Sequence, residues 1–237
     1  MVLSPPSLDR PVYQMNEAAR LLGIPDKTLR RWLDGDRRFE RVIEPLIRAE
    51  RTGETDVTWG EFVEAGFLCV CRKRRLPIER LRPLIVAMRE KLQTPYPLAQ
   101  ARPLYSDGRQ LLWREQQSLG IERELFLVVE GSGEDAYQLV LAPIARQFFD
   151  RVDFEPPDAE SGVAAKWFPW QKHRRIVLDP RVSFGLPNIN GIRTEVIAEL
   201  RTAGEPVSAL REMFGEYGIT QQDTEEAIHF ETSLWAA

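Results

Sequence analysis

Between residues 16 and 33, apolar residues recur with the spacing of two short amphipathic helices joined by a tight corner. The apolar positions of each helix share one face; they are Ala18, Ala19 and Leu22 in the first helix and Thr28, Leu29, Trp32 and Leu33 in the second. Gly23 lies at the corner, where a residue without a Cβ can end the first helix with a positive φ. Pro25 suits the start of the second helix because its missing N–H would have no partner there. This pattern predicts a helix-turn-helix.

The outward face of the second helix is basic. Once the apolar face is buried, Lys27, Arg30 and Arg31 project outward, where they can meet phosphates and base edges in a major groove. Thr28, in the first turn of the same helix, completes this set of candidate DNA-binding residues. The alternative is an ordinary helical hairpin with a solvated basic face, and the spacing favours DNA binding.

The chain after the helix-turn-helix predicts a wing and two further helices. Residues 51–55 are turn-rich between apolar flanks and predict the hairpin of a wing. The next helix is expected to begin at Thr58, which can act as N-cap while Glu61 completes a capping box. Another helix is expected from about residue 77 to residue 92, with a bend at Pro83.

Charge is segregated along the chain, although the net charge is −4. Lys and Arg outnumber Asp and Glu by nine to six in residues 20–51, by eight to two in 71–91 and by five to one in 165–181, whereas the ratio is three to nine in 192–237. Exposed charges act over roughly 8 Å at physiological salt, so an acidic total does not exclude DNA binding by a basic patch. Arg72, Lys73, Arg74 and Arg75 are therefore a second set of candidate DNA-binding residues, with a merely solvated surface as the equally weighted alternative.

Proline and glycine mark a change of organisation after residue 94. Residues 125–129 and 138–141 predict two paired strands, and Pro143 then begins a helix. Aromatic and basic residues are interleaved in residues 166–175, and we interpret the aromatic ones as core in preference to a nucleotide-stacking surface.

Three short helices separated by glycine are predicted at the C-terminal end, over residues 194–204, 207–214 and around 227–230. The third helix is acidic and would repel phosphate. We therefore expect a mainly α protein of the α+β class, with a flexible N-terminus (1–10), a winged helix-turn-helix DNA-binding domain (11–105), a small central β-containing α+β segment (106–165) and a C-terminal three-helix, helix-turn-helix-like domain (166–237).

Several classes of protein are excluded on composition. No run of eighteen apolar residues and no signal peptide is present, so we expect a cytoplasmic protein without a membrane partner. Cys69 and Cys71 lie two apart in a predicted helix and are interpreted as packing residues, and the two histidines have no neighbours that complete a metal site. We expect no metal, no cofactor and no enzymatic activity, because no phosphate-binding loop, nucleophile elbow or acid–base set with histidine is recognisable.

Two segments resemble known families. Residues 14–33 resemble the N-terminal helix-turn-helix of MerR-like regulators, although the long C-terminal coiled coil of that family is missing. Residues 176–231 resemble the domain family of unknown function numbered 433, through the motif residues Asp179, Pro180, Gly185, Pro187, Ile189, Gly191, Arg193 and Thr194. The combination resembles VapB-type antitoxins. That resemblance implies a bacterial toxin–antitoxin pair in which this chain neutralises a PIN-like ribonuclease toxin and represses its own operon by binding operator DNA. The alternative is a free-standing MerR-like transcriptional regulator.

Two surfaces of the C-terminal half are candidates for binding the toxin. One is the basic stretch with its aromatic anchors, and the other is the acidic C-terminal helix; the residues concerned are Lys166, Trp167, Trp170, Arg174 and Arg175 in the first and Trp235 in the second. A homodimer or a toxin–antitoxin hetero-oligomer is expected, because helix-turn-helix proteins usually read two half-sites. The candidate dimer face comprises Phe214, Ile228, Phe230 and Leu234, which are alternatively core residues.

Overall fold

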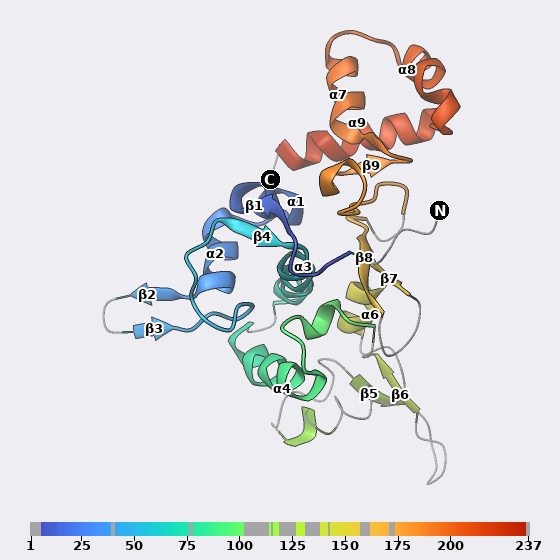
Figure 1. Ribbon diagram of the computed structural model, residues 1–237. Coiled ribbons are helices and arrows are strands. Elements are labelled where there is room, and N and C mark those ends of the chain that lie inside the picture. The colour runs from blue at the N-terminus through green and yellow to red at the C-terminus, as the bar shows by residue number, and fades with distance from the viewer. Residues whose placement is uncertain are drawn as a thin grey trace.

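The computed structural model describes residues 6–38, 41–75, 78–101, 114, 116–118, 127–130, 138–141, 143–156, 162–170 and 174–235. Within these ranges the chain is an α+β protein with many helices and five two-stranded antiparallel sheets. The N-terminal helices and the C-terminal helices form two groups. The segment around β7 (Val152–Glu155), β8 (Val163–Trp167) and β9 (Asn188–Ile189) connects them (Figure 1). The expected fold class is confirmed.

The N-terminal half contains the predicted helix-turn-helix. Its elements are β1 (Pro11–Gln14), α1 (Met15–Leu22), α2 (Asp26–Asp34), β2 (Asp36–Arg38), β3 (Arg41–Ile43), β4 (Asp56–Thr58), α3 (Trp59–Lys73), the 3-10 helix η1 (Ile78–Leu81), α4 (Arg82–Leu92) and the 3-10 helix η2 (Pro97–Ala99). Gly23 ends α1 with a φ of 65°, as predicted for a residue without a Cβ. Thr58 and Glu61 form the predicted capping box at the start of α3.

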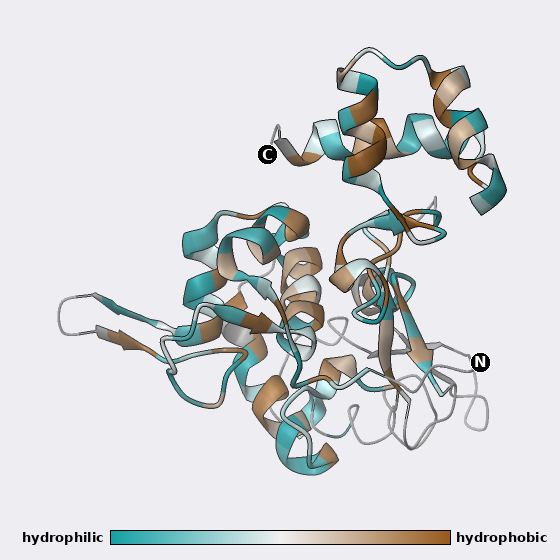
Figure 2. Ribbon diagram, turned by 45° about the horizontal axis from the view of Figure 1, so that its top comes forward, coloured by the Kyte–Doolittle hydropathy of each residue, from teal (hydrophilic) through white to brown (hydrophobic). Residues whose placement is uncertain are grey.

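The expected hairpin at residues 51–55 is wrong. That segment contains no strand, because the backbone N–H groups of Thr52 and Gly53 donate to the buried carboxylate of Asp34 and not to a neighbouring strand. The hairpin lies earlier, where β2 pairs with β3, and it protrudes beside α2 (Figures 1 and 2). Gly35 permits this hairpin, because its φ is 72° and a Cβ at this position would collide with the backbone of Ile43.

The expected bend at Pro83 is also wrong. A 3-10 turn, η1, precedes the helix, and α4 begins at Arg82, which places Pro83 in its first turn. A proline there removes no helical hydrogen bond, so the helix needs no bend.

The first hydrophobic core surrounds α3, which is buried from Trp59 to Cys71. Cys69 and Cys71 are both free thiols within it, as expected for packing residues. Residues from the second half of the chain join this core: the Trp59 indole N–H donates to the Ala164 carbonyl over 2.6 Å, and the Trp167 ring packs directly on Gly66. Core residues on both sides of residue 165 thus belong to one cluster.

The central part of the chain contains β5 (Leu127–Glu130), β6 (Gln138–Leu141), α6 (Pro143–Phe149), β7 (Val152–Glu155) and β8 (Val163–Trp167). The predicted strand pair is confirmed as β5 and β6, and the predicted helix at Pro143 as α6. The pairing of β7 with β8 was not predicted. Most of residues 102–126, within the expected central segment, lie outside the described residues.

The C-terminal region has its own smaller core. It consists of the 3-10 helix η4 (Ser183–Gly185), β9 (Asn188–Ile189), β10 (Ile192–Arg193), α7 (Thr194–Thr202), α8 (Val207–Phe214), the 3-10 helix η5 (Gly215–Tyr217) and α9 (Gln221–Trp235). The three predicted helices are confirmed as α7, α8 and α9. Phe230 is 2% exposed within this core, and Phe214, Ile228 and Leu234 pack against it. Of the four residues expected at a dimer face, Phe230 is therefore a core residue, whereas Phe214, Ile228 and Leu234 are partly buried at the edge of this core.

Among the described residues, the C-terminal region contacts β1 and α1, and Leu234 of α9 also packs against the first core. The Tyr13 hydroxyl donates to the Gly185 carbonyl over 2.6 Å in a buried position, and Arg20 lies 3.9 Å from Glu231. Leu8, in the N-terminal segment expected to be flexible, is buried in the first core, whereas residues 1–5 lie outside the described residues.

A buried guanidinium connects the elements around α3. The Nε of Arg48 donates to Glu61 over 2.7 Å, and one of its Nη atoms donates to Asp34 over 2.9 Å. Its other Nη atom donates to the Asp56 carbonyl of β4 over 2.9 Å. All three side chains are at most 7% exposed. One cation therefore neutralises two buried carboxylates that belong to different helices.

Replacing Arg48 with methionine is expected to destabilise the fold by about 3–5 kcal/mol, because two carboxylates would remain buried without a cation. Arg51→Met, at an exposed position three residues away, is the control and is expected to change the free energy of unfolding by less than about 0.5 kcal/mol. Urea denaturation measures both. Equal stabilities of the two variants would contradict the role given to Arg48.

Glu64 is a second buried carboxylate on α3, and it is 1% exposed. Burial raises the pKa of this carboxyl from 4.5 to about 7, although Arg89 at 3.3 Å and the Leu98 N–H at 3.1 Å favour its charged form. Between pH 4.5 and about pH 7, Glu64 is therefore protonated in the folded state and ionised in the unfolded state.

The sign of the pH dependence follows from this raised pKa. The stability contributed by protonated Glu64 is complete below pH 4.5 and is lost as the pH rises through about 7. Between these values the free energy of unfolding should fall by at most about 1.4 kcal/mol per pH unit. Glu64→Gln is expected to flatten this dependence in urea titrations from pH 5 to 8, whereas Glu90→Gln, at an exposed site, should preserve it. Identical pH profiles for Glu64→Gln and the wild type would refute the assignment.

Candidate nucleic-acid interface and C-terminal groove

The second helix of the helix-turn-helix presents the predicted candidate residues on its outer side. Leu29, Trp32 and Leu33 are at most 3% exposed and hold α2 against the first core. Lys27 and Arg30 are exposed, whereas Thr28 and Arg31 are half-buried. Arg30 lies 3.9 Å from Asp26 with both side chains about half exposed, and such a surface pair contributes little energy. The α2 cations are thus accessible to a ligand.

The second basic set lies beside the first. The guanidinium of Arg72, in the last turn of α3, donates to the Thr28 hydroxyl of α2 over 3.0 Å. Lys73, Arg74 and Arg75 follow directly and are exposed. Residues 44 positions apart in the sequence therefore form one basic surface, which we call the α2–α3 surface; it comprises Lys27, Thr28, Arg30, Arg31 and Arg72 to Arg75.

The β2–β3 hairpin adds a feature that the sequence interpretation missed. It follows α2 directly, and Arg37 on β2 is exposed. Figure 2 shows the hairpin protruding from the N-terminal helices. The signal was the Gly35 turn between α2 and the closely spaced arginines 37, 38 and 41, which the turn-rich segment 51–55 obscured.

The residues predicted to bind a partner do not form one surface in the folded chain. Trp167 is 3% exposed in the first core, so it cannot anchor a partner, and the core interpretation of this aromatic residue is confirmed. Trp170 is half-buried against Phe230 and His229. Trp235 ends α9, but its side chain lies outside the described residues.

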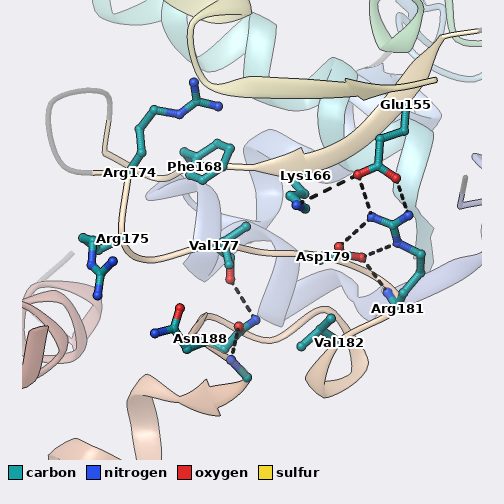
Figure 3. A pocket seen from close by; sticks show the side chains of 12 residues that line it. Glu155, Lys166, Phe168, Arg174, Arg175, Val177, Asp179, Arg181, Val182 and Asn188 are labelled. Atoms are coloured by element: carbon teal, nitrogen blue, oxygen red, sulfur yellow. Dashed lines mark hydrogen bonds and ion pairs between the residues drawn. The ribbon is translucent and has the colours of Figure 1, made fainter. Parts of the chain in front are cut away.

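The remaining three, Lys166, Arg174 and Arg175, line one open groove of about 640 Å³ between β8 and the β9–β10 turn (Figure 3). Arg174 stacks on the Phe168 ring, with 4.0 Å between the guanidinium carbon and the ring centroid. Asn188 and Asn190, from the segment that resembles family 433, lie on the other side of the groove.

The groove is less basic than its sequence suggests, because its cations are paired within the chain. Arg175 binds Asp223 through two hydrogen bonds of 2.6 Å, Arg174 pairs with Asp153, and Lys166 lies 3.9 Å from Glu155. Arg181 contacts both Asp179 and Glu155, as Figure 3 shows, and its hydrogen bonds to Asp179 raise the pKa of the guanidinium. An acidic partner would have to compete with the buried carboxylates of Asp223 and Asp179 for Arg175 and Arg181, whereas the partly exposed pairs of Arg174 and Lys166 contribute little energy.

Among the described residues, no three His, Cys, Asp or Glu side chains are grouped closely enough to hold a metal ion. The helices of the described residues are all too short or too polar to span a membrane.

Comparisons with known proteins agree with this architecture. Residues 11–85 match the family described as "Putative DNA-binding HTH domain". The chain is 31% identical over 226 residues to the uncharacterised protein Rv2308 of Mycobacterium tuberculosis, covering 94% of this chain and 91% of that protein. It is 29% identical over 236 residues to "Putative antitoxin VapB45" of the same organism, covering 93% of each. The crystal structure of Rv2018 from Mycobacterium tuberculosis has a TM-score of 0.71 at 25% identity and covers 93% of this chain and 99% of that chain.

Removing two charges from the α2–α3 surface is expected to weaken binding to duplex DNA regardless of sequence. Each phosphate contact that Lys73→Ala/Arg74→Ala removes should lower the slope of log K against log salt by roughly 0.9. Titration of a random-sequence duplex at several salt concentrations measures this slope. The control is Arg201→Ala/Arg211→Ala, which removes two exposed charges from the C-terminal helices and should leave the slope unchanged. A wild-type slope in the first variant would contradict phosphate contact there.

Proposed function

Because this chain belongs to the same protein family as the uncharacterised protein Rv2308 of Mycobacterium tuberculosis, we propose its function from the features described above. It is an antitoxin: it binds operator DNA through the α2–α3 surface and neutralises a partner ribonuclease through its C-terminal half. By binding the operator it also represses its own operon.

The single observation that carries the DNA-binding part is the hydrogen bond from Arg72 to Thr28. It brings the basic end of α3 against the exposed face of a helix-turn-helix, where a recognition helix needs flanking phosphate contacts to fix its register. The β2–β3 hairpin next to α2 extends this surface. Arg30 and Arg31 are the candidates for reading base edges, since they lie along α2.

The antitoxin part is supported by similarity over nearly the whole length of a protein named a putative antitoxin. It is also supported by the resemblance of residues 176–231 to domain family 433, which VapB-type antitoxins carry. The C-terminal helices have a core of their own, so they can present a surface to a second protein without taking part in the DNA-binding face. We propose that the chain acts as a homodimer on DNA, because one helix-turn-helix offers few base contacts.

The test uses the full chain, the protein encoded by the gene next to its own, and the promoter of that gene pair. We expect the two proteins to co-purify and the chain to inhibit RNA cleavage by its partner. The chain should also bind the promoter more tightly than a random duplex. Arg30→Ala/Arg31→Ala should lower promoter affinity by about 1–3 kcal/mol for each base-reading arginine while leaving ribonuclease inhibition intact.

The control for this experiment is Arg201→Ala/Arg211→Ala, which should bind the promoter as the wild type does. Promoter binding without binding of the neighbouring gene product would instead indicate a free-standing regulator. Inhibition that is lost together with promoter binding in Arg30→Ala/Arg31→Ala would contradict the separation of the two surfaces.

A further inference from the structure

We infer that three exposed apolar side chains, Phe184, Met213 and Tyr217, form the docking surface of the C-terminal half, and that their partner is a basic, RNA-binding face of another protein. This inference rests on the proposed antitoxin function and identifies the surface and the partner chemistry that it requires. We call these three residues the apolar surface.

Phe184 is the most unusual of the three. Its side chain is 82% exposed, the largest value among the exposed large apolar residues in the described part of the chain. Its φ is 58°, and the φ of Ser183 before it is 49°. Residues with a Cβ rarely adopt this conformation, which is most often kept where it serves a function. The fold thus holds a large aromatic side chain in water at a conformational cost.

The loop that carries Phe184 is firmly attached on both sides. The Gly185 N–H donates to the Val182 carbonyl over 2.9 Å, and the Leu186 N–H donates to the Ser183 carbonyl over 3.1 Å. The buried Tyr13 hydroxyl holds the Gly185 carbonyl, and a Cβ on Gly185 would lie only 2.6 Å from Val12. A rigidly presented aromatic residue loses little entropy when it is bound, which is the property of an interface anchor.

Two hydrogen bonds join the elements that carry the apolar surface. The Ser183 hydroxyl donates to the Gly191 carbonyl over 3.0 Å, and the Asn190 side-chain amide donates to the Tyr217 carbonyl over 3.0 Å. Asn190 and Gly191 are the β9–β10 turn, so η4, this turn and η5 are contiguous. Tyr217 is 56% exposed and Met213, four residues earlier, is 51% exposed.

The charge around the apolar surface indicates the charge of its partner. Glu212 and Glu216 flank Met213 and are exposed, and residues 192–237 carry nine acidic side chains against three arginines. This charge repels nucleic acid and complements a basic protein surface. Among the cations of this region, Arg174 and Arg175 are paired with carboxylates of the same chain, whereas Arg211, two residues before Met213, is exposed. A ribonuclease must carry a basic face to hold RNA, so acidic side chains around apolar anchors fit that face.

The apolar surface differs from both partner surfaces expected from the sequence, because it includes neither the basic stretch of residues 166–181 nor the acidic C-terminal helix α9 with Trp235. Among the described residues of the basic stretch 166–181, Arg175 and Arg181 are paired with buried carboxylates, and the anchor Trp167 is buried. The apolar surface combines Phe184 with Met213 and Tyr217, which belong to the acidic residues 192–237.

The decisive variant is Phe184→Gly in the full chain. Glycine adopts a positive φ without a steric cost, and the side chain it replaces is almost fully exposed. We therefore expect the Tm of the free chain to rise by about 2–4 °C. Affinity for the neighbouring gene product should fall by about 10- to 100-fold, because the anchor is lost. Met213→Ala/Tyr217→Ala should weaken the same complex to a similar degree.

The control is Val42→Ala/Val86→Ala, which removes exposed apolar groups from the N-terminal half and should leave the affinity unchanged. Affinity of the wild-type complex should decrease with salt, and single-stranded RNA should compete with the chain for the partner. This inference would be overturned if Phe184→Gly and Met213→Ala/Tyr217→Ala both bound the partner as tightly as the wild type does, or if RNA did not displace the chain from the partner. Either result would leave the antitoxin function in place. A neighbouring gene product that does not bind the wild type would overturn the antitoxin function itself.

Discussion

The buried guanidinium of Arg48 is the constraint on which the N-terminal half depends. It neutralises Asp34 at the end of α2 and Glu61 in the first turn of α3, and it satisfies the Asp56 carbonyl of β4. Asp34 in turn accepts from the backbone of residues 52 and 53, and Glu61 completes the capping box of α3. An unpaired charge among these groups would be costly, because none of them reaches water freely. One side chain therefore connects the end of α2, the start of α3 and β4.

Helix α3 carries this arrangement to the rest of the molecule. It is buried along most of its length, with the helix-turn-helix packed on it from one part of the chain and β8 and α6 from another. Its last turn leaves the core and is basic, and there Arg72 reaches Thr28. The same helix thus provides the centre of the hydrophobic core and one half of the candidate DNA-binding surface. Cations at a helix C-terminus also stabilise the helix. Basic residues in this turn therefore suit both the stability of α3 and the proposed DNA binding.

The C-terminal helices are a second unit that touches the first at few points. The Tyr13–Gly185 hydrogen bond and the proximity of Arg20 to Glu231 join η4 and α9 to β1 and α1, close to the helix-turn-helix. Charge divides along the same line, with basic segments around α2 and α3 and an acidic α7–α9 region. The proposed binding of DNA at one end and of a basic protein at the other requires this division, because the opposite surface would repel each ligand.

The sequence alone determined the local structure. Helical periodicity, the glycine at the α1 corner, the Thr58–Glu61 capping box and the glycine-separated helices at the C-terminal end depend on interactions within a few residues, and these were predicted correctly. Only the tertiary structure decided where the hairpin lies, because Asp34 accepts hydrogen bonds from the backbone of residues 52 and 53, eighteen and nineteen positions away. Only the tertiary structure could also show that Arg174 and Arg175 are paired with carboxylates 21 and 48 residues away, and that Phe184 is exposed. Composition records which charges and apolar groups a chain contains; the fold decides which of them neutralise one another and which remain for a partner.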